Sequence, residues 1–274
     1  TQQIRRLGCS LDWKREAFTM DEARNRAVTE AFIRLKEKGL IYRDVYLVNW
    51  CPHDLTAISD DEVEYREVAG SLWHLHYPLA DGSGHLTVAT TRPETMRGDT
   101  AVAVNPNDPR AAALRGKEVV LPIVGRTIPI VEDDYVVLPD ADSSDTKAQF
   151  ATGFLKVTPA HDPNDWDIGA RHDLPVVNVL GPDGTISDEH GWEDVSDEAR
   201  PFVGMSREDA RAAIVAWFAE HDLLEETRDY THSVGHSYRS HAPIEPWLSD
   251  QWYVAVTDDR LRGSALRAQD PAQS

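Results

Sequence analysis

The feature that most constrains the fold is a run of short apolar segments between two amphipathic helices. Residues 72–77 alternate apolar and polar side chains, Asp81-Gly82-Ser83-Gly84 can form a turn, and residues 85–90 alternate again, which together predict a β-hairpin. Further short strands are expected at 100–104, 119–123, 127–131, 135–138, 154–158 and 176–180. Many short strands separated by Gly, Pro or Asp clusters favour a β-rich mixed α/β fold that contains a closed barrel.

Two peripheral helices are expected to flank this β-rich region. At the start of the first, Thr19 and Glu22 fit a capping box, and Gly39 stands where a C-terminal cap belongs. The second is expected to begin at Ser206, with Asp209 three residues later.

Composition excludes several classes of protein. An apolar share of 41% over 274 residues suffices for one substantial core, and no apolar run is long enough for a membrane span. Cys9 and Cys51 have no CxxC companion, which argues against a disulfide framework or a Cys-based zinc site and fits a reducing cytoplasm. Because the chain starts without Met and without a signal peptide, we expect it to be a piece of a longer protein.

The charge balance opposes a simple nucleic-acid interface. The chain has 28 Lys and Arg against 47 Asp and Glu, a formal net charge of -19. A protein that neutralises phosphates is expected to carry a basic face. Composition alone therefore favours a small-molecule enzyme or an acidic interaction domain, and only specific motifs can outweigh it.

The first segment suited to chemistry is Thr90-Thr91-Arg92-Pro93-Glu94-Thr95-Met96. Pro93 favours an extended Arg92, so the preceding strand is expected to end there and a polar loop to begin. Its threonines and Arg92 could hold an anionic or ester group. A hydroxyl-rich turn with a surface ion pair explains the same residues, and by themselves they favour that simpler interpretation.

The second segment runs from residue 154 to residue 165. In a strand, Phe154, Lys156 and Thr158 share one face, and a Lys inside an apolar strand is costly unless it is paired or functional. The strand is followed by Asp162, a natural N-cap, and by Asp165, which would complete a capping box. Capping alone explains Asp162 as well as function does, although one carboxylate can both cap a helix and face a pocket.

A metal site is a weaker alternative for this second segment. His161, Asp162, Asp165 and His172 could be imagined as a cluster of ligands. Their spacing matches no common zinc signature, and no Cys takes part. We therefore expect no metal.

Together the two segments resemble the editing domains of class I aminoacyl-tRNA synthetases, and the valyl enzymes in particular. Residues 90–102 are similar to the threonine-rich motif of these domains and residues 156–165 to their second motif. Residues 49–52 and 244–249 are similar to the start and end of the valyl insert, so the resemblance covers nearly the whole chain. Arg97 departs from the family, which tends to have an aliphatic residue there.

The resemblance implies an organisation and a reaction. Residues 1–48 would be an N-terminal flanking helical segment, 49–238 the editing β-barrel domain, and 239–274 a C-terminal flanking segment and tail. The reaction would be hydrolysis of the aminoacyl ester of Thr-tRNA(Val), with the 3′-terminal aminoacyl-adenosine and its threonine moiety as substrate and the remainder of the parent synthetase as partner. No cofactor and no membrane are implied. Nothing resembles the ATP-handling motifs of the parent, and the acidic balance suggests that most tRNA affinity lies elsewhere.

The same resemblance assigns residues to the site. Val and Thr are nearly isosteric, and valyl enzymes are a standard example of a synthetic site that cannot reject such a competitor strongly, so the editing pocket must demand a hydroxyl. Our hypothesis is that Asp162 recognises that hydroxyl, and by the family pattern Asp165 would anchor the α-ammonium. The implied catalytic residues are Lys156, Asp165 and Thr95. The implied substrate-binding residues are Arg92, Thr91, Thr158, Asp162 and His161.

Two alternatives from other classes stay open. One is a metal-dependent hydrolase that uses His161, Asp162 and His172. The other is an aminoacyl-binding module without catalysis.

Overall fold

The computed structural model describes residues 1–269, which form two compact units. The first unit comprises residues 1–45 together with the chain from residue 250 onward, and the second comprises residues 46–249. The predicted tail begins in the first unit, and its last five positions, 270–274, lie outside the described residues. Within residues 1–269 no helix is long and apolar enough to cross a membrane.

The first unit is mainly helical, and its longest helix is α2 (Glu22–Glu37). Its N-cap is Asp21 rather than the predicted Thr19, because the Asp21 carboxylate accepts the backbone N–H of Arg24 at 2.9 Å. The C-terminal prediction is confirmed, since Gly39 has φ +69° and follows the last turn. The other helical elements of this unit are α1 (Gln2–Arg6), η1 (Trp13–Arg15), η5 (Asp259–Gly263, π-helical) and α7 (Ser264–Ala268).

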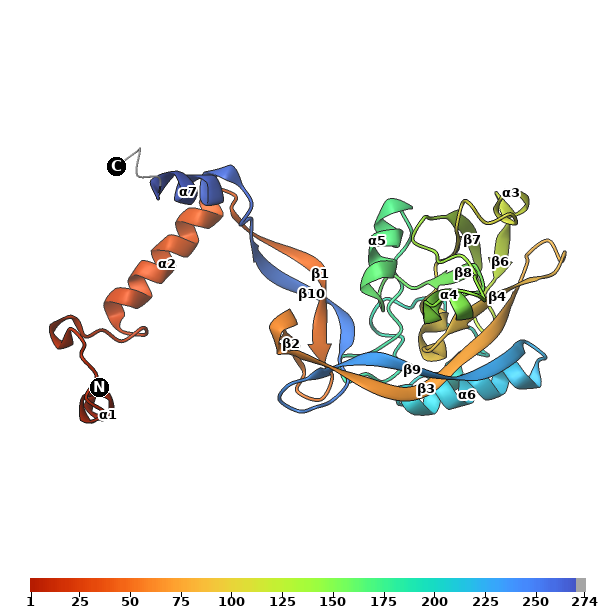
Figure 1. The fold of residues 1–274 in the computed structure, drawn as a ribbon, viewed down its shortest axis with the longest axis horizontal. Coiled ribbons are helices and arrows are strands. Elements are labelled where there is room, and N and C mark those ends of the chain that lie inside the picture. Colours follow the sequence, from red (N-terminus) through yellow and green to blue (C-terminus); the bar gives the residue numbers. More distant parts are fainter. Residues whose placement is uncertain (270–274) are drawn as a thin grey trace. The chain divides into compact units, whose positions relative to one another are not determined.

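The strands form three sheets, with orders β10-β1-β2, β4-β3-β9 and β6-β7-β5-β8 (Figure 1). Their bounds are β1 (Ile41–Cys51), β2 (Thr56–Ile58), β3 (Val63–Pro78), β4 (His85–Thr90), β5 (Ala101–Val104), β6 (Glu118–Val120), β7 (Thr127–Glu132), β8 (Phe154–Val157), β9 (Leu224–Ser237) and β10 (Glu245–Val254). A β-rich mixed α/β fold is therefore confirmed. The hydrogen-bonded ladders among the described residues do not join into one closed barrel, and the barrel stays a prediction.

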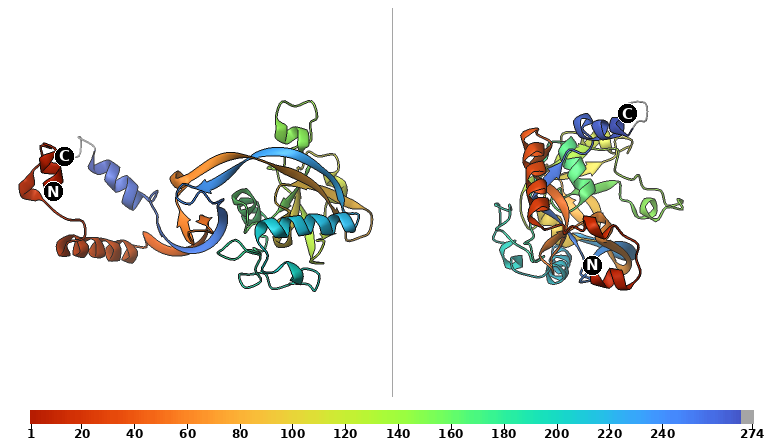
Figure 2. Two further views of the ribbon diagram at one scale, coloured as in Figure 1. Left: turned by 90° about the horizontal axis from the view of Figure 1, so that it is seen from below. Right: turned by 90° about the vertical axis from the view of Figure 1, so that its left-hand side faces the viewer.

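The long strand β3 organises the second unit. It pairs antiparallel with β4 in the predicted hairpin, with Trp73 opposite Thr90 and Pro78 opposite His85. Along most of its length it also pairs antiparallel with β9, which lies about 150 residues away in the sequence. The resulting ribbon curves beneath the rest of the unit, and helix α6 (Arg207–Glu220) runs beside it (Figures 1 and 2).

Two predicted strands are wrong. Residues 135–138 form a turn, because the backbone N–H groups of Tyr135 and Val136 bond to the side chain and carbonyl of Asp133. Residues 176–180 are irregular apart from a single bridge between Leu180 and Ile186. In the second segment the N–H groups of Val179 and Leu180 donate to the side chains of His161 and Asn178 rather than to a neighbouring strand, so apolar content alone does not make a strand.

The main core of the second unit combines side chains from the hairpin sheet, from the sheet of β5 to β8 and from α6. Tyr77, Val88 and Phe218 are fully buried there, along with Trp192 from the loop before α6. The predicted start of α6 is confirmed, because the Ser206 side chain accepts the N–H of Asp209. The remaining short helices of this unit are η2 (Asp60–Glu62), η3 (Pro93–Gly98), α3 (Ala111–Leu114), α4 (Thr146–Phe150), α5 (Pro163–Arg171) and η4 (Arg200–Phe202).

Candidate functional site

All eight residues assigned from the sequence line one cavity of about 630 Å³ in the second unit. They come from two places in the fold: the end of β4 with the following turn η3, and strand β8 with the N-terminus of α5. The residues are Thr91, Arg92, Thr95, Lys156, Thr158, His161, Asp162 and Asp165. Which of them act on a substrate remains a prediction, but the fold brings them together.

Lys156 lines this cavity and is paired with a buried carboxylate. Its Nζ donates to Asp99 Oδ1 at 3.2 Å, to Thr95 Oγ1 at 3.1 Å and to Thr158 Oγ1 at 2.5 Å. Asp99 has no exposed side-chain area and also accepts the hydroxyls of Thr158, at 2.6 Å, and Tyr77, at 2.8 Å. Burial raises the pKa of Asp99, while Lys156 opposes that rise. The result is an internally satisfied ion pair that holds a cation at the cavity wall.

Asp165 is the buried carboxylate of the site. Its Oδ2 accepts the backbone N–H of Thr158 at 2.8 Å, so it does not complete the predicted capping box. That bond ties α5 to the end of β8 instead. Burial raises the pKa of Asp165 to about 7, with Lys156 opposing and Asp162 adding to the rise. Its Oδ1 has no hydrogen-bond partner among the described residues, which leaves one carboxylate oxygen for a ligand.

Asp162 both caps α5 and lines the cavity. Its Oδ1 accepts the N–H of Asn164 at 2.7 Å and that of Asp165 at 3.3 Å, and Pro163 occupies the first helical position. The predicted cap is therefore confirmed. Within residues 1–269 its Oδ2 makes no hydrogen bond, so capping does not use up the carboxylate.

Arg92 follows strand β4, at the N-cap of η3, and is fixed by several acceptors. Its backbone N–H donates to Thr90 Oγ1 at 3.0 Å, and its Nη1 donates to the carbonyl oxygen of His161 at 3.1 Å. The guanidinium also forms ion pairs with Glu94 and Glu245. Arg92 is thus not a surface arginine, and its side chain is 29% exposed at the cavity edge.

His161 is a neutral, buried wall residue. Its Nε2 accepts the backbone N–H of Val179 at 3.0 Å, which places the ring proton on Nδ1. Burial first, and then the positive charges of Arg92, Lys156 and Arg97, lower its pKa well below the ordinary value. Its ring therefore anchors the segment after α5.

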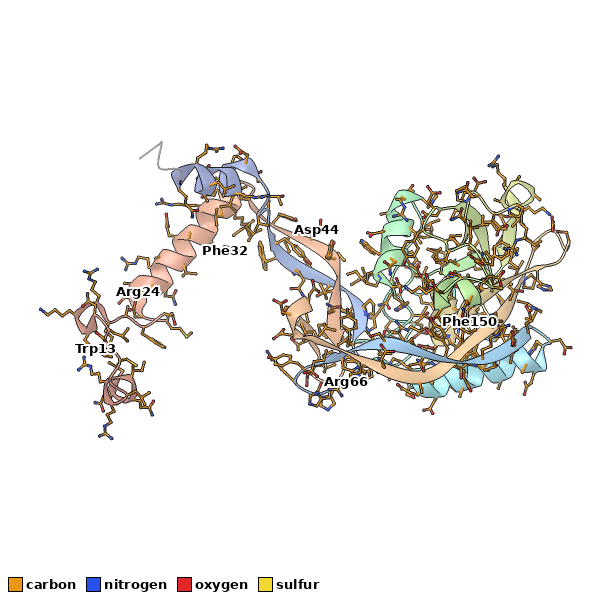
Figure 3. The ribbon with its side chains drawn as sticks, viewed as in Figure 1. Trp13, Arg24, Phe32, Asp44, Arg66 and Phe150 are labelled. Carbon is orange, nitrogen blue, oxygen red and sulfur yellow. The ribbon has the colours of Figure 1, made fainter. Side chains whose placement is uncertain are left out.

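An aromatic rim completes the cavity and was not foreseen from the sequence. Phe150, which ends α4, is labelled in Figure 3. It packs edge to face on Tyr230 of β9, and Tyr230 stacks on His232 of the same strand. All three line the cavity. Period two in β9 could have placed Tyr230 and His232 on one face, but that strand was not expected.

The alternative metal cluster does not assemble in the part of the chain that the structure describes. There, no three His, Cys, Asp or Glu side chains are arranged to hold a metal ion. His172 bonds to Asp133 at 2.9 Å and does not line the cavity with His161 and Asp162.

Arg97, the departure from the family pattern, is fully buried beneath the site. Its guanidinium lies over the rings of Trp192 and Phe202, and only Nη2 has a partner, the Glu94 carbonyl, while Nε and Nη1 have none among the described residues. Burial lowers its pKa to about 10, although Glu94 opposes this. A buried cation with two unpaired nitrogens is costly.

We therefore expect Arg97→Met to keep or raise stability by about 1–2 kcal/mol, as an apolar side chain replaces unpaired donors. Urea unfolding followed by circular dichroism measures this. The matched control is Arg110→Met, because Arg110 pairs with Asp108 at 2.7 Å and should lose stability. A loss for Arg97→Met as large as that of the control would contradict the expectation.

Comparison with known proteins fits this geometry. The family model described as tRNA synthetases class I (I, L, M and V) matches residues 1–273. The chain belongs to this family. The chain is 53% identical over 270 residues to a valine–tRNA ligase of Parasynechococcus marenigrum, and the match covers 98% of this chain and 28% of that relative. It is 48% identical to a valine–tRNA ligase of Aquifex aeolicus, covering 97% of this chain and 23% of that relative.

The chain thus spans about a quarter of the length of these synthetase relatives. Among solved structures, the LeuRS-tRNA-LeuAMS ternary complex of Agrobacterium radiobacter K84 matches 85% of this chain and 35% of that chain, with 20% identity and a TM-score of 0.41.

Proposed function

We propose that this chain carries the editing site of a valyl-tRNA synthetase and hydrolyses the aminoacyl ester of Thr-tRNA(Val). One observation supports this above all: Asp162 and Asp165, each with one carboxylate oxygen that no described residue bonds, line the same cavity as the paired cation Lys156. The choice of tRNA and of amino acid in this proposal rests on the relatives, which are named valine–tRNA ligase. We also propose that the strands around the cavity form the closed barrel of such editing domains, within residues 49–238.

The two carboxylates suit the two donors of a threonyl group. Asp165 is buried and would pair with the α-ammonium, an interaction that both threonine and valine can make. Asp162 would accept the threonine hydroxyl, which valine lacks. If valine entered, Asp162 would lose its water without gaining a partner, and this penalty would oppose binding of the correct amino acid.

The reaction needs no protein nucleophile, because an aminoacyl ester is already activated. Water would attack the carbonyl carbon, the bond from that carbon to the ribose oxygen would break, and the ribose oxygen would take a proton. Lys156 and Thr95 would stabilise the negative charge that develops on the carbonyl oxygen. Thr91, Thr158 and Arg92 would hold the ribose and the ester. His161 would contribute by fixing Arg92, because its carbonyl oxygen accepts Arg92 Nη1.

The size and rim of the cavity suit the end of a tRNA. A volume of about 630 Å³ is within the usual range for small-ligand sites and suits an aminoacyl-adenosine. The aromatic rim of Phe150, Tyr230 and His232 offers faces on which a base can stack. We propose that the remainder of the parent synthetase supplies most of the contacts to the tRNA body.

The direct test is deacylation of Thr-tRNA(Val) and Val-tRNA(Val) by the chain, with and without a chelator. We expect threonine release well above the rate without protein, little valine release, and no effect of the chelator. Loss of activity with the chelator would instead favour a metal-dependent hydrolase. Binding of a nonhydrolysable threonyl-adenosine analogue without threonine release would favour the non-catalytic module.

We expect kcat/KM for this hydrolysis to rise with pH through about 7, because Asp165 must be ionised to pair with the substrate ammonium. In the folded chain the pKa of Asp165 is raised above its ordinary value of 3.8. The contribution of Asp165 to the free energy of unfolding is therefore complete below pH 3.8 and is lost as pH rises through about 7. Rates between pH 5.5 and 8.5, corrected for spontaneous ester hydrolysis, measure the first effect. A profile that falls across this range would contradict it.

A further inference from the structure

The guanidinium of Arg92 is held by one neighbour in the sequence and by two groups from distant parts of the chain. Its Nη2 is hydrogen-bonded to Glu245, its Nε donates to Glu94 at 3.3 Å, and its Nη1 donates to the carbonyl of His161 at 3.1 Å. A guanidinium has five N–H groups. These three bonds leave two for a ligand, so Arg92 can be fixed from behind and still bind at the cavity edge.

Glu245 is the most remote of these partners, 153 residues from Arg92 in the sequence. It is the first residue of β10 and is only 6% exposed. Its Oε2 takes the Arg92 bond, and its Oε1 accepts Arg207 Nη1 from the first turn of α6 at 2.5 Å. With each oxygen in a charge-assisted bond, the carboxylate has a fixed orientation.

Glu94 forms a second bridge beside the first. It has no exposed side-chain area and accepts both Nε and Nη2 of Arg211 at 2.9 Å. Burial alone would raise the pKa of Glu94, but Arg211 and Arg92 outweigh burial and lower it. Glu94 and Glu245 therefore link Arg92 to two guanidinium groups of α6, those of Arg207 and Arg211.

We propose that Glu245 is a positioning residue for the hydrolysis, acting on the substrate only through Arg92. The inference rests on the function proposed above. Glu94 lies only two residues from Arg92 in the chain and accepts from Nε alone, at 3.3 Å. Without Glu245, Nη2 loses its acceptor, and the partly exposed guanidinium is free to turn toward solvent. Arg92 would then hold the ribose and ester less often, which raises KM more than it lowers kcat.

A double-mutant cycle tests this, with Glu245→Gln, Arg92→Gln and the combined variant in the chain described here. We expect Glu245→Gln to lower kcat/KM for Thr-tRNA(Val) by about 10–30-fold, mainly through KM, and to change it less than about 2-fold once Arg92 is already Gln. Glu62→Gln is the matched control, because Glu62 pairs with Arg239 at 3.2 Å away from the cavity and should change nothing.

The affinity for a nonhydrolysable threonyl-adenosine analogue is the second readout, and it separates the two proposals. If the wild-type chain binds the analogue but hydrolyses nothing, the proposed function fails, and the role of Glu245 is then decided by the same cycle on affinity. If circular dichroism shows that Glu245→Gln is unfolded, Glu245→Asp takes its place in the cycle. We expect a smaller loss of kcat/KM and of affinity for that variant, with the same dependence on Arg92. The inference would be overturned if the Glu245 substitution lowered kcat/KM or affinity equally with and without Arg92. It would also be overturned if the substitution lowered neither.

Discussion

Replacement of Asp165 by Asn is expected to lower kcat/KM for Thr-tRNA(Val) about 100-fold and to leave the chain as stable as before or more stable. Asn has the same shape, and its Oδ1 can still accept the Thr158 N–H that Asp165 accepts at 2.8 Å. What disappears is the negative charge available to the α-ammonium. Because burial raises the pKa of Asp165 to about 7, that charge is costly in the folded chain above neutral pH.

Deacylation rates and urea unfolding at pH 8 measure both effects on the same samples. Asp167→Asn is a suitable control, because Asp167 lies on the same helix but does not line the cavity. A lower rate accompanied by an equal or higher free energy of unfolding identifies a residue kept for function rather than for stability. An unchanged rate would contradict the role assigned to Asp165.

Replacement of Lys156 by Met is expected to cost stability as well as activity, which sets it apart from Asp165. Asp99 is fully buried, and Lys156 is the only cation bonded to it in the described chain. Removing one partner of a buried ion pair costs about 3–5 kcal/mol, since the other charge is left without compensation. The rate is expected to fall at least about 100-fold, because the cation at the cavity wall is lost.

A compensated variant separates the two losses. In Lys156→Met combined with Asp99→Asn, the buried charge is gone and the hydroxyl of Tyr77 can still donate to the Asn oxygen. We expect this variant to recover most of the stability measured by urea unfolding and none of the rate. The control Lys117→Met removes an exposed pair with Asp81 and should change stability by less than about 1 kcal/mol. Recovery of the rate in the compensated variant would show that Lys156 serves the fold alone.

The features that could be predicted from the sequence are those set by neighbouring residues. The Asp-Gly-Ser-Gly turn fixes the β3–β4 hairpin, and Ser206 and Asp162 each cap a helix a few residues away. Where two nearby residues competed for one role, the sequence pattern was insufficient. Asp21 and Thr19 could both cap α2, and only the geometry of the first turn favours the carboxylate.

The features that could not be predicted depend on contacts between distant residues. The sequence of strand β9 is mostly charged and polar. It forms a strand because it pairs with β3, for example Arg228 with Leu72. Asp165 fits a capping box by spacing, but the nearby Thr158 N–H takes its oxygen once β8 and α5 pack together. Propensity is a weak guide wherever tertiary pairing decides the outcome.

The candidate site divides in the same way. Its first layer, including Lys156 and Thr95, lies in two continuous motifs and could be found by resemblance. Of the groups that hold this layer in place, Asp99, which pairs with Lys156, lies within the first motif. Tyr77, which donates to Asp99, and Glu245, which fixes Arg92, lie outside both motifs. No spacing rule connects residues so far apart, so only the structure could identify them.

The most direct test of the central claim is the affinity of the chain for nonhydrolysable threonyl- and valyl-adenosine analogues, measured by isothermal titration calorimetry. The two ligands differ in size by almost nothing and in one hydroxyl. Our account predicts that the threonyl analogue binds at least about 10-fold more tightly, and that Asp162→Asn, which can still cap α5, removes most of that preference. Equal affinities in the wild-type chain, or tighter binding of the valyl analogue, would contradict it.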